Sequence, residues 1–144
     1  MRQFLFIISI GLLGVAAQAA DKPMETDPFA YLDTNISDLD EFTWQKRPVI
    51  VFADSPNDPN FQQQLGFFQS ETEPLTKRDV VVLIDTDPSS MQPLREKFRP
   101  RGFMLVLIGK DGSIKLRKPF PLSVRELSRT IDKMPMRRRE IKSR

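Results

Sequence analysis

The chain has 144 residues, of which 40% are hydrophobic and 28% are charged, and its formal net charge is +3. This length fits one small domain with a leader or a tail. The sequence contains neither cysteine nor histidine. Disulfides, thiol nucleophiles, thiolate metal sites, histidine haem ligands and Ser-His-Asp triads are therefore excluded for this chain.

The N-terminus has the pattern of an export signal. Arg2 supplies a positive charge, and an apolar run follows from Phe4 to Ala16. This run is shorter than the roughly 20 apolar residues that a membrane-spanning helix needs. Ala17-Gln18-Ala19 has the small-x-small form of a cleavage site. We predict a signal peptide at residues 1–19, cleaved near Ala19, and export to a periplasm or the extracellular space. An uncleaved anchor is the alternative.

Residues 20–43 form a predicted acidic N-terminal arm. Between Asp21 and Glu41 the arm carries seven carboxylates and one lysine. At its end, Phe42–Trp44 is predicted to be a short extended segment. The predicted domain then occupies residues 44–134.

Two apolar runs open the predicted domain. Val49–Ala53 and Asp79–Ile84 have strand length and do not alternate, which is typical of strands covered on both faces. Between them, Asp58 can cap a helix with Pro59 at its first position, and a polar loop is predicted at Glu71–Lys77. A helical crossover between two strands predicts that they are parallel.

The second half is predicted to contain a helix, a hairpin and a last helix. Met91–Phe98 is the expected helix, and Phe103–Ile108 is a third apolar strand. Lys110-Asp111-Gly112 is a hairpin signal, so the alternating segment Ile114–Arg117 should pair antiparallel with the third strand. Ser123 begins a capping box for the last helix.

This order of elements resembles the thioredoxin fold. The stretches RPVIVFA, FQQQLGFF, RDVVVLIDTD and GFMLVLIGKDGSIK make the region from Trp44 to Met134 similar to the peroxiredoxin-like P-DUDES family, domain of unknown function 4174. The resemblance implies an α/β three-layer sandwich whose mixed sheet has helices on both faces. It implies no particular activity, because none is assigned to the family.

The resemblance also locates a lost redox centre. In thioredoxins the loop after the first central strand holds a Cys-x-x-Cys motif, and aligned on Phe52 that motif falls on Asn57-Asp58-Pro59-Asn60. The position of the facing cis-proline falls on Met104. The resemblance therefore implies a redox-inactive scaffold without thiol oxidoreductase or peroxidase activity, and we expect no cofactor.

The first candidate site is this loop. Ser55, Asn57, Asp58 and Asn60, with the N–H groups of a helix N-terminus, can bind a small anion or a peptide backbone. Alternatively, Asp58 and Pro59 simply begin the helix.

The second candidate site is the loop before the third strand, which faces the first loop in this fold. Arg99 and Arg101, beside Met104, can clamp a carboxylate or a phosphate. The alternative is two solvated arginines around a proline turn.

A third, weaker candidate lies where the second strand ends. Asp85 and Asp87 are at the carboxyl end of a strand, where α/β folds often bind ligands. Two carboxylates offer too few oxygens for a closed Ca²⁺ site, and Asp-Pro turn chemistry explains them better. A metal site there is only a minor alternative, and no carboxylate pair indicates general acid–base catalysis.

The last candidate is the basic tail at residues 135–144, which contains Arg137-Arg138-Arg139. It can contact anionic lipid headgroups or an acidic partner, or it is a solvated, frayed terminus. Because no aromatic residues are interleaved with the cations, nucleic acid is not an expected partner.

The leading hypothesis is an exported, redox-inactive binding module whose partner is a protein or a small anionic ligand. One alternative is an enzyme acting on a small anionic substrate, with the arginines as electrophilic groups and Asp54 or Asp58 as the base. Another is an accessory that docks on thiol oxidoreductases without exchanging electrons.

Overall fold

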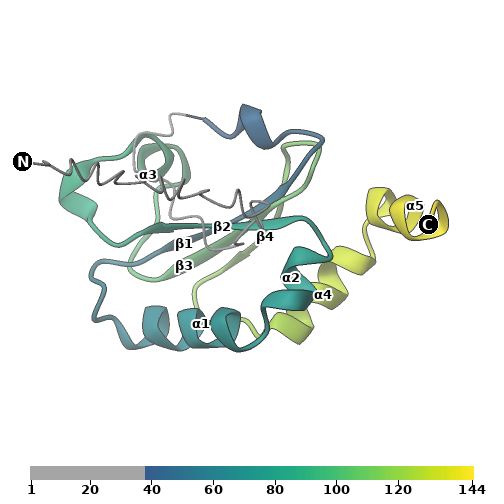
Figure 1. The fold of residues 1–144 in the computed structure, drawn as a ribbon. Helices are drawn as coiled ribbons and strands as arrows, with labels where there is room; N and C mark the ends of the chain where they lie inside the picture. Colours follow the sequence, from purple (N-terminus) through teal and green to yellow (C-terminus); the bar gives the residue numbers. More distant parts are fainter. Residues whose placement is uncertain (1–37) are drawn as a thin grey trace, which may run out of the picture.

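The computed structural model describes residues 38–144 (Figure 1). The predicted signal peptide and most of the acidic arm, up to residue 37, lie outside the described residues. Within residues 38–144, no helix is both long enough and apolar enough to cross a membrane.

The centre of the fold is one mixed sheet. Its strands are β1 (Arg47–Phe52), β2 (Val80–Asp85), β3 (Met104–Ile108) and β4 (Ile114–Lys118). The strands lie in the order β2-β1-β3-β4. β1 is parallel to β2 and antiparallel to β3, and β3 is antiparallel to β4. The four predicted strands are therefore confirmed, as are the parallel pairing of the first two and the antiparallel pairing of the last two.

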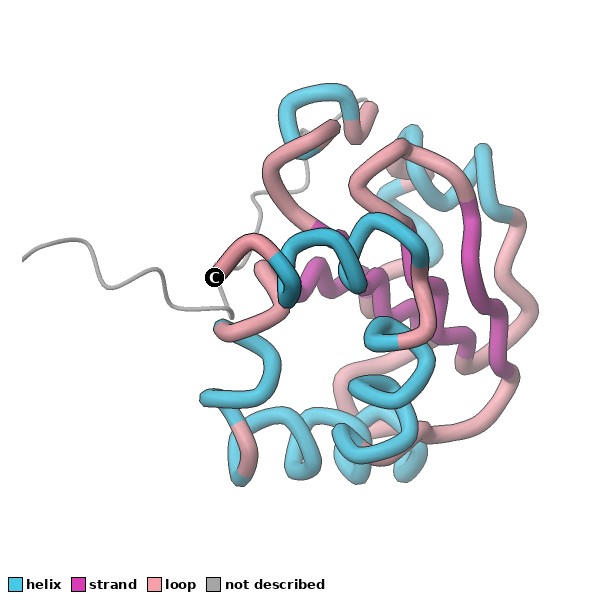
Figure 2. Tube along the Cα trace, turned by 90° about the vertical axis from the view of Figure 1, so that its right-hand side faces the viewer, coloured by secondary structure: helices cyan, strands magenta, loops and turns pink. Residues whose placement is uncertain are grey.

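Helices cover both faces of the sheet (Figure 1, Figure 2). On one face lie α1 (Pro59–Ser70), α2 (Thr72–Thr76) and α4 (Val124–Asp132). On the other lies α3 (Pro93–Phe98). The remaining helices are α5 (Pro135–Lys142) and the 3₁₀ turns η1 (Asp40–Phe42) and η2 (Pro88–Ser90). This three-layer arrangement is the predicted thioredoxin-like α/β fold.

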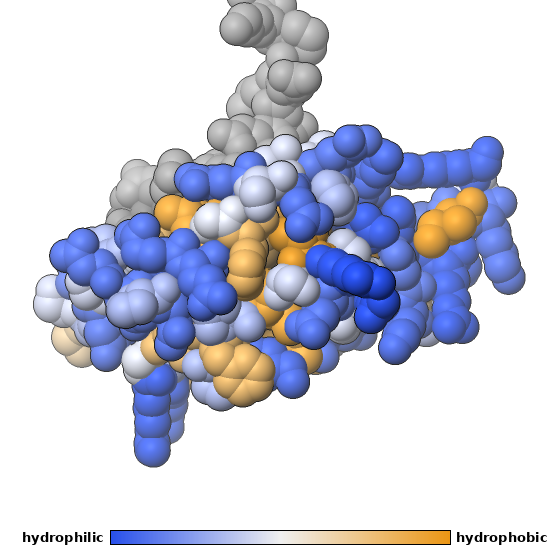
Figure 3. All heavy atoms as spheres, turned by 90° about the horizontal axis from the view of Figure 1, so that it is seen from below, coloured by the Kyte–Doolittle hydropathy of each residue, from blue (hydrophilic) through white to orange (hydrophobic). Residues whose placement is uncertain are grey.

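The unbroken apolar run of β1 follows from the coverage of both faces. Val49 and Val51 belong to the core under α1, α2 and α4, whereas Ile50 and Phe52 belong to the core on the side of α3. Successive side chains of a strand point to opposite faces, so a strand that is buried on both faces needs apolar residues at every position. Seen from the side of α1 and α4, the outer surface is mostly hydrophilic with a limited apolar strip (Figure 3).

A buried amide ties α1 to the segment before α4. Gln64 is fully buried; its Nε2 donates to the carbonyl of Leu122 at 2.9 Å, and its Oε1 accepts from the N–H of Leu122 at 2.8 Å. Both polar groups of Leu122 are thus satisfied by one side chain. Buried polar groups are stable when they are paired in this way, so Gln64 is part of the fold rather than of a binding site.

Two segments in the N-terminal half of the fold differ from their predicted structure. Phe42–Trp44 is not extended: η1 ends at Phe42, and the chain turns through Trp44 at a φ of 68°. The turn is held because the N–H of Trp44 donates to the carbonyl of Lys110 at 2.7 Å. Glu71–Lys77 is not a loop but contains α2, because Leu75 is fully buried against the core and anchors the turn.

The predicted helix at Met91–Phe98 begins later than expected. Met91 has a φ of 46° and is exposed, and α3 starts only at Pro93. Proline is favoured at the first position of a helix, because its φ already has a helical value. Its missing N–H costs nothing there, since the N–H groups of the first turn have no acceptor within the helix. The short 3₁₀ turn η2 fills the space between β2 and α3.

The interpretation of residues 135–144 as a solvated, frayed tail is also wrong. Residues Pro135–Lys142 form α5, and Arg137 is buried. Glu140, the one carboxylate of this helix, is bonded to Arg47 of β1. A contact between residues far apart in sequence therefore orders a segment that composition alone describes as a charged tail.

Candidate functional site

The register of the sheet brings the two predicted loops to the same end of the molecule. Phe52, the last residue of β1, is the Cα partner of Met104, the first residue of β3. The loop that follows β1 and the loop that precedes β3 therefore leave the sheet at one end, as expected from the fold.

The loop after β1 is satisfied by its own side chains. Asp58 caps α1, and its Oδ1 accepts from the N–H groups of Asn60 at 2.8 Å and Phe61 at 3.4 Å. The Oγ of Ser55 accepts from the N–H of Asn57 at 3.1 Å. Because these N–H groups already have acceptors, the loop builds a helix start and presents few free donors to a ligand.

The loop before β3 lines a cavity of about 260 Å³. Three of the predicted residues, Arg99, Arg101 and Met104, lie on its wall. Phe103 and Pro119 add apolar surface. The predicted residues of the first loop, Ser55, Asn57, Asp58 and Asn60, are not part of this wall. The structure thus gathers one predicted cluster and leaves the other outside the cavity.

Two further cations complete the cavity, and the sequence analysis missed both. They are Arg117 and Lys118 at the end of β4. In the antiparallel register Lys118 lies opposite Leu105 and Arg117 opposite Val106. The hairpin signal was the available clue: counting residue pairs outward from the turn places the end of β4 beside the start of β3.

The four cations of the cavity have no carboxylate partner among residues 38–144. Arg117 lies over the ring of Phe98, with its guanidinium carbon 5.5 Å from the ring centroid. Lys118 lies 5.8 Å from the centroid of Phe120. These aromatic contacts hold the cations in place without neutralising them, so the site has a positive electrostatic character.

Asp85 and Asp87 are both engaged elsewhere. Asp85 is buried and paired with Arg95, whose Nε and Nη2 donate to its two carboxylate oxygens at 3.0 Å each. Asp87 caps η2, and the hydrogen bond from the hydroxyl of Ser89 lowers the pKa of Asp87. No group of three or more histidine, cysteine, aspartate or glutamate side chains in the described chain is placed to hold a metal ion.

The general bases that the enzyme hypothesis requires are not at the cavity. Asp54 is exposed in the loop after β1, and Asp58 is the cap of α1. Neither lies on the cavity wall beside the arginines. General base catalysis needs the base within hydrogen-bonding reach of the bound substrate, so neither aspartate is placed to act as the base on a ligand in this cavity.

Comparisons with known proteins give relatives of low identity. The chain is 27% identical over 158 residues to Coiled-coil domain-containing protein 80 of Danio rerio, a match that covers 89% of this chain and 17% of that protein. The chain therefore spans less than a fifth of that relative. It is similar in structure to chloroplastic thioredoxin z, with a TM-score of 0.48 and 20% identity over 60% of this chain and 75% of the other.

A second solved structure has a comparable similarity. It is the mitochondrial 2-Cys peroxiredoxin from Plasmodium falciparum, with a TM-score of 0.48 and 18% identity over 65% of this chain and 78% of the other. The family model described as Domain of unknown function (DUF4174) matches residues 38–140. Because that match covers most of the chain, the protein belongs to the DUF4174 family.

Proposed function

We propose that this protein is an exported, redox-inactive binding module that captures an anionic ligand in the cavity beside β3. The observation that supports this function is the cluster of Arg99, Arg101, Arg117 and Lys118 around one cavity, with no carboxylate partner among the described residues. All four cations contribute to the wall of the cavity, and like charges that share one site repel one another. An anion in the cavity offsets this repulsion, which favours its binding.

The wall of the cavity also indicates the shape of the ligand. Arginine binds planar carboxylates and phosphates through two parallel N–H groups. Phe103, Met104 and Pro119 provide an apolar surface beside these donors. The combination suits an anion with an apolar body, such as an aromatic or branched carboxylate, and it does not require a thiol or a metal.

A charge-matched pair of probes tests this proposal. Benzoate is expected to bind saturably to the full chain, whereas benzamide, which has the same ring and no charge, is expected to bind much more weakly. The double variant Arg101→Gln/Arg117→Gln should weaken benzoate binding roughly tenfold, because it removes two charged donors. Isothermal titration calorimetry or ligand-observed NMR measures both effects.

Arg125→Gln/Arg129→Gln is the matched control for that experiment. It removes the same charge from α4, where both arginines are exposed and have no carboxylate partner in residues 38–144. Equal weakening by both double variants, or equal affinity for benzoate and benzamide, contradicts a specific anion site. An unchanged thermal midpoint in each variant shows that binding, not folding, was altered.

Export is the part of the proposal that rests on the N-terminal sequence. Arg2, the apolar run Phe4–Ala16 and the Ala17-Gln18-Ala19 pattern support a cleaved leader. N-terminal sequencing of the protein recovered from the exported fraction of a bacterial host is expected to begin at residue 20. Recovery of the intact N-terminus in the membrane fraction contradicts cleavage and favours an anchor.

A further inference from the structure

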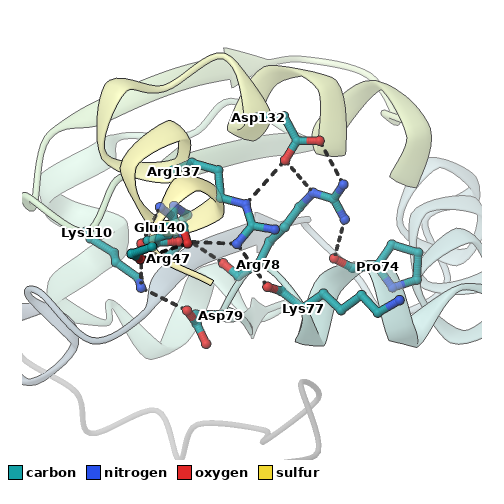
Figure 4. Close-up of polar contacts among 10 residues, drawn as sticks. Arg47, Pro74, Lys77, Arg78, Asp79, Lys110, Asp132, Arg137 and Glu140 are labelled. Carbon is teal, nitrogen blue, oxygen red and sulfur yellow. Dashed lines mark hydrogen bonds and ion pairs between the residues drawn. The ribbon is translucent and has the colours of Figure 1, made fainter.

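A second group of charges lies at the opposite end of the sheet, where α5 docks (Figure 4). Glu140 accepts from Arg47 at 3.0 Å, and it pairs with Lys110 at 2.8 Å and Arg137 at 3.3 Å. Asp79 and Asp132 join the same network through Lys110 and through Arg78 and Arg137. The network therefore joins four cations, Arg47, Arg78, Lys110 and Arg137, with three carboxylates, Asp79, Asp132 and Glu140. The network therefore has a net charge of +1.

Arg47 is the deeply buried member of this network, and its guanidinium is only partly used. Its side chain is 1% exposed. A guanidinium carries five N–H groups. Nη1 donates to the carbonyl of Arg78 at 2.9 Å and to Oε2 of Glu140 at 3.3 Å, and Nη2 donates to Oε1 of Glu140 at 3.0 Å.

The remaining donors of Arg47 lie on one edge of the guanidinium. Nε is buried and has no hydrogen-bond partner in the described part of the chain. The second N–H of Nη2 points the same way as Nε–H, since these two nitrogens form the side edge of the planar group. That edge has the two-pronged shape that takes a carboxylate or a phosphate. A buried donor without a partner is costly, so the site favours an acceptor.

A cavity of about 220 Å³ adjoins these groups. Its wall includes Arg47, Lys110 and Arg139, the ion pair of Asp111 with Lys115, and residues 134–136 at the start of α5. Arg139 is exposed and has no carboxylate partner among residues 38–144. The cap position of α5 is Met134, whose side chain makes no capping hydrogen bond. Pro135, the first residue of α5, has no N–H. The N–H groups that follow it at the start of a helix have no acceptor within the helix, and they favour anions.

We infer that this cavity is a binding site for a small free oxyanion, such as phosphate, sulfate or a simple carboxylate. The free edge of Arg47 holds two of its oxygens, and Arg139 and the start of α5 supply the remaining positive potential. The bound anion also balances the surplus charge of the network. A neutral acceptor at the Nε–H of Arg47 would not balance that charge. The site is separate from the cavity beside β3, because the two lie at opposite ends of β1. Arg47 is the first residue of β1, whereas the cavity beside β3 includes Met104, which pairs with Phe52, the last residue of β1.

Titration of the full chain with inorganic phosphate, sulfate and acetate tests this inference, each at constant ionic strength in sodium chloride. In ¹H–¹⁵N NMR spectra recorded for arginine side chains, the Nε–H signal of Arg47 is expected to shift saturably. Arg139→Gln should weaken the affinity roughly threefold to fivefold, because it removes one exposed charge. Arg138→Gln removes the same charge from the neighbouring position of α5, outside the cavity wall, and should leave the affinity unchanged.

The three anions identify the source of the oxyanion. Binding of phosphate and sulfate alone assigns a tetrahedral anion, and binding of acetate alone assigns a carboxylate; either result supports the site. A linear, non-saturating shift with all three anions overturns it. Equal weakening by Arg138→Gln and Arg139→Gln also overturns it, because the effect is then general screening rather than a contact. The variant Arg101→Gln/Arg117→Gln should not alter this titration, so the two sites can fail independently.

Discussion

Arg95→Met is expected to lower the free energy of unfolding by about 3–5 kcal/mol, since it leaves one partner of a buried ion pair without the other. The side chains of Arg95 and Asp85 are only 11% and 10% exposed. Arg95 also donates to the backbone carbonyls of Ala53 at 3.0 Å and Asp85 at 3.1 Å. Its guanidinium carbon lies 5.5 Å from the ring centroid of Phe52. One arginine on α3 thus ties together the ends of β1 and β2.

Equilibrium unfolding in urea measures this loss. The double variant Arg95→Met/Asp85→Asn should recover part of it, because no charge is then left buried without a partner. Arg125→Met, an exposed arginine of α4, is the control and should change the stability by less than about 0.5 kcal/mol. A loss from Arg95→Met no greater than that of the control contradicts a structural role for the pair. With that outcome, Asp85 would again be a candidate for a ligand-binding carboxylate.

Glu140→Gln is expected to lower the stability at neutral pH by about 3 kcal/mol. Partial burial alone raises the pKa of Glu140, but hydrogen bonds from Lys110 and Arg47 outweigh it and lower the pKa from 4.5 to about 2. Because the folded pKa is below the unfolded one, the carboxylate stabilises the fold fully above about pH 4.5. This stabilisation is lost as the pH falls from about 4.5 to about 2, where the unfolded chain binds a proton that the folded chain does not.

Urea unfolding across pH 2 to 7 checks both the size and the position of this effect. The difference in stability between the wild type and Glu140→Gln should be largest at neutral pH and should shrink through that acidic range. Glu96→Gln is the control, because Glu96 is exposed on α3 and has no ion pair in residues 38–144. A difference that is independent of pH would show that the glutamine variant is unstable for a reason other than its lost charge.

The strands and the hairpin could be predicted because local pattern decides them. The apolar runs that became β1, β2 and β3 are strand-length segments between clear turn residues, and the Asp111-Gly112 turn has a φ of 82° at Gly112, as such turns require. Asp58 and Pro59 begin α1 as their capping chemistry indicates. These signals act over a few residues, so they are visible in the chain itself.

The candidate site was only half predictable. Arg99 and Arg101 are two residues apart, and the proline turn made their position in the fold clear. Arg117 and Lys118 come from another strand, and the alternating pattern of Ile114–Arg117 predicted only that strand. Their contribution depends on register, which puts Lys118 opposite Leu105.

By itself, the sequence of this protein determined the class of fold, the order of the elements along the chain and the absence of thiol chemistry, because composition and short-range pattern are properties of the chain. Tertiary structure alone decided the role of the charged residues. Arg137 and Glu140 read as parts of a solvated tail, yet α5 places Glu140 beside Arg47, 93 residues away in sequence. Long-range ion pairing depends on where folding brings each side chain, and no local pattern records that position.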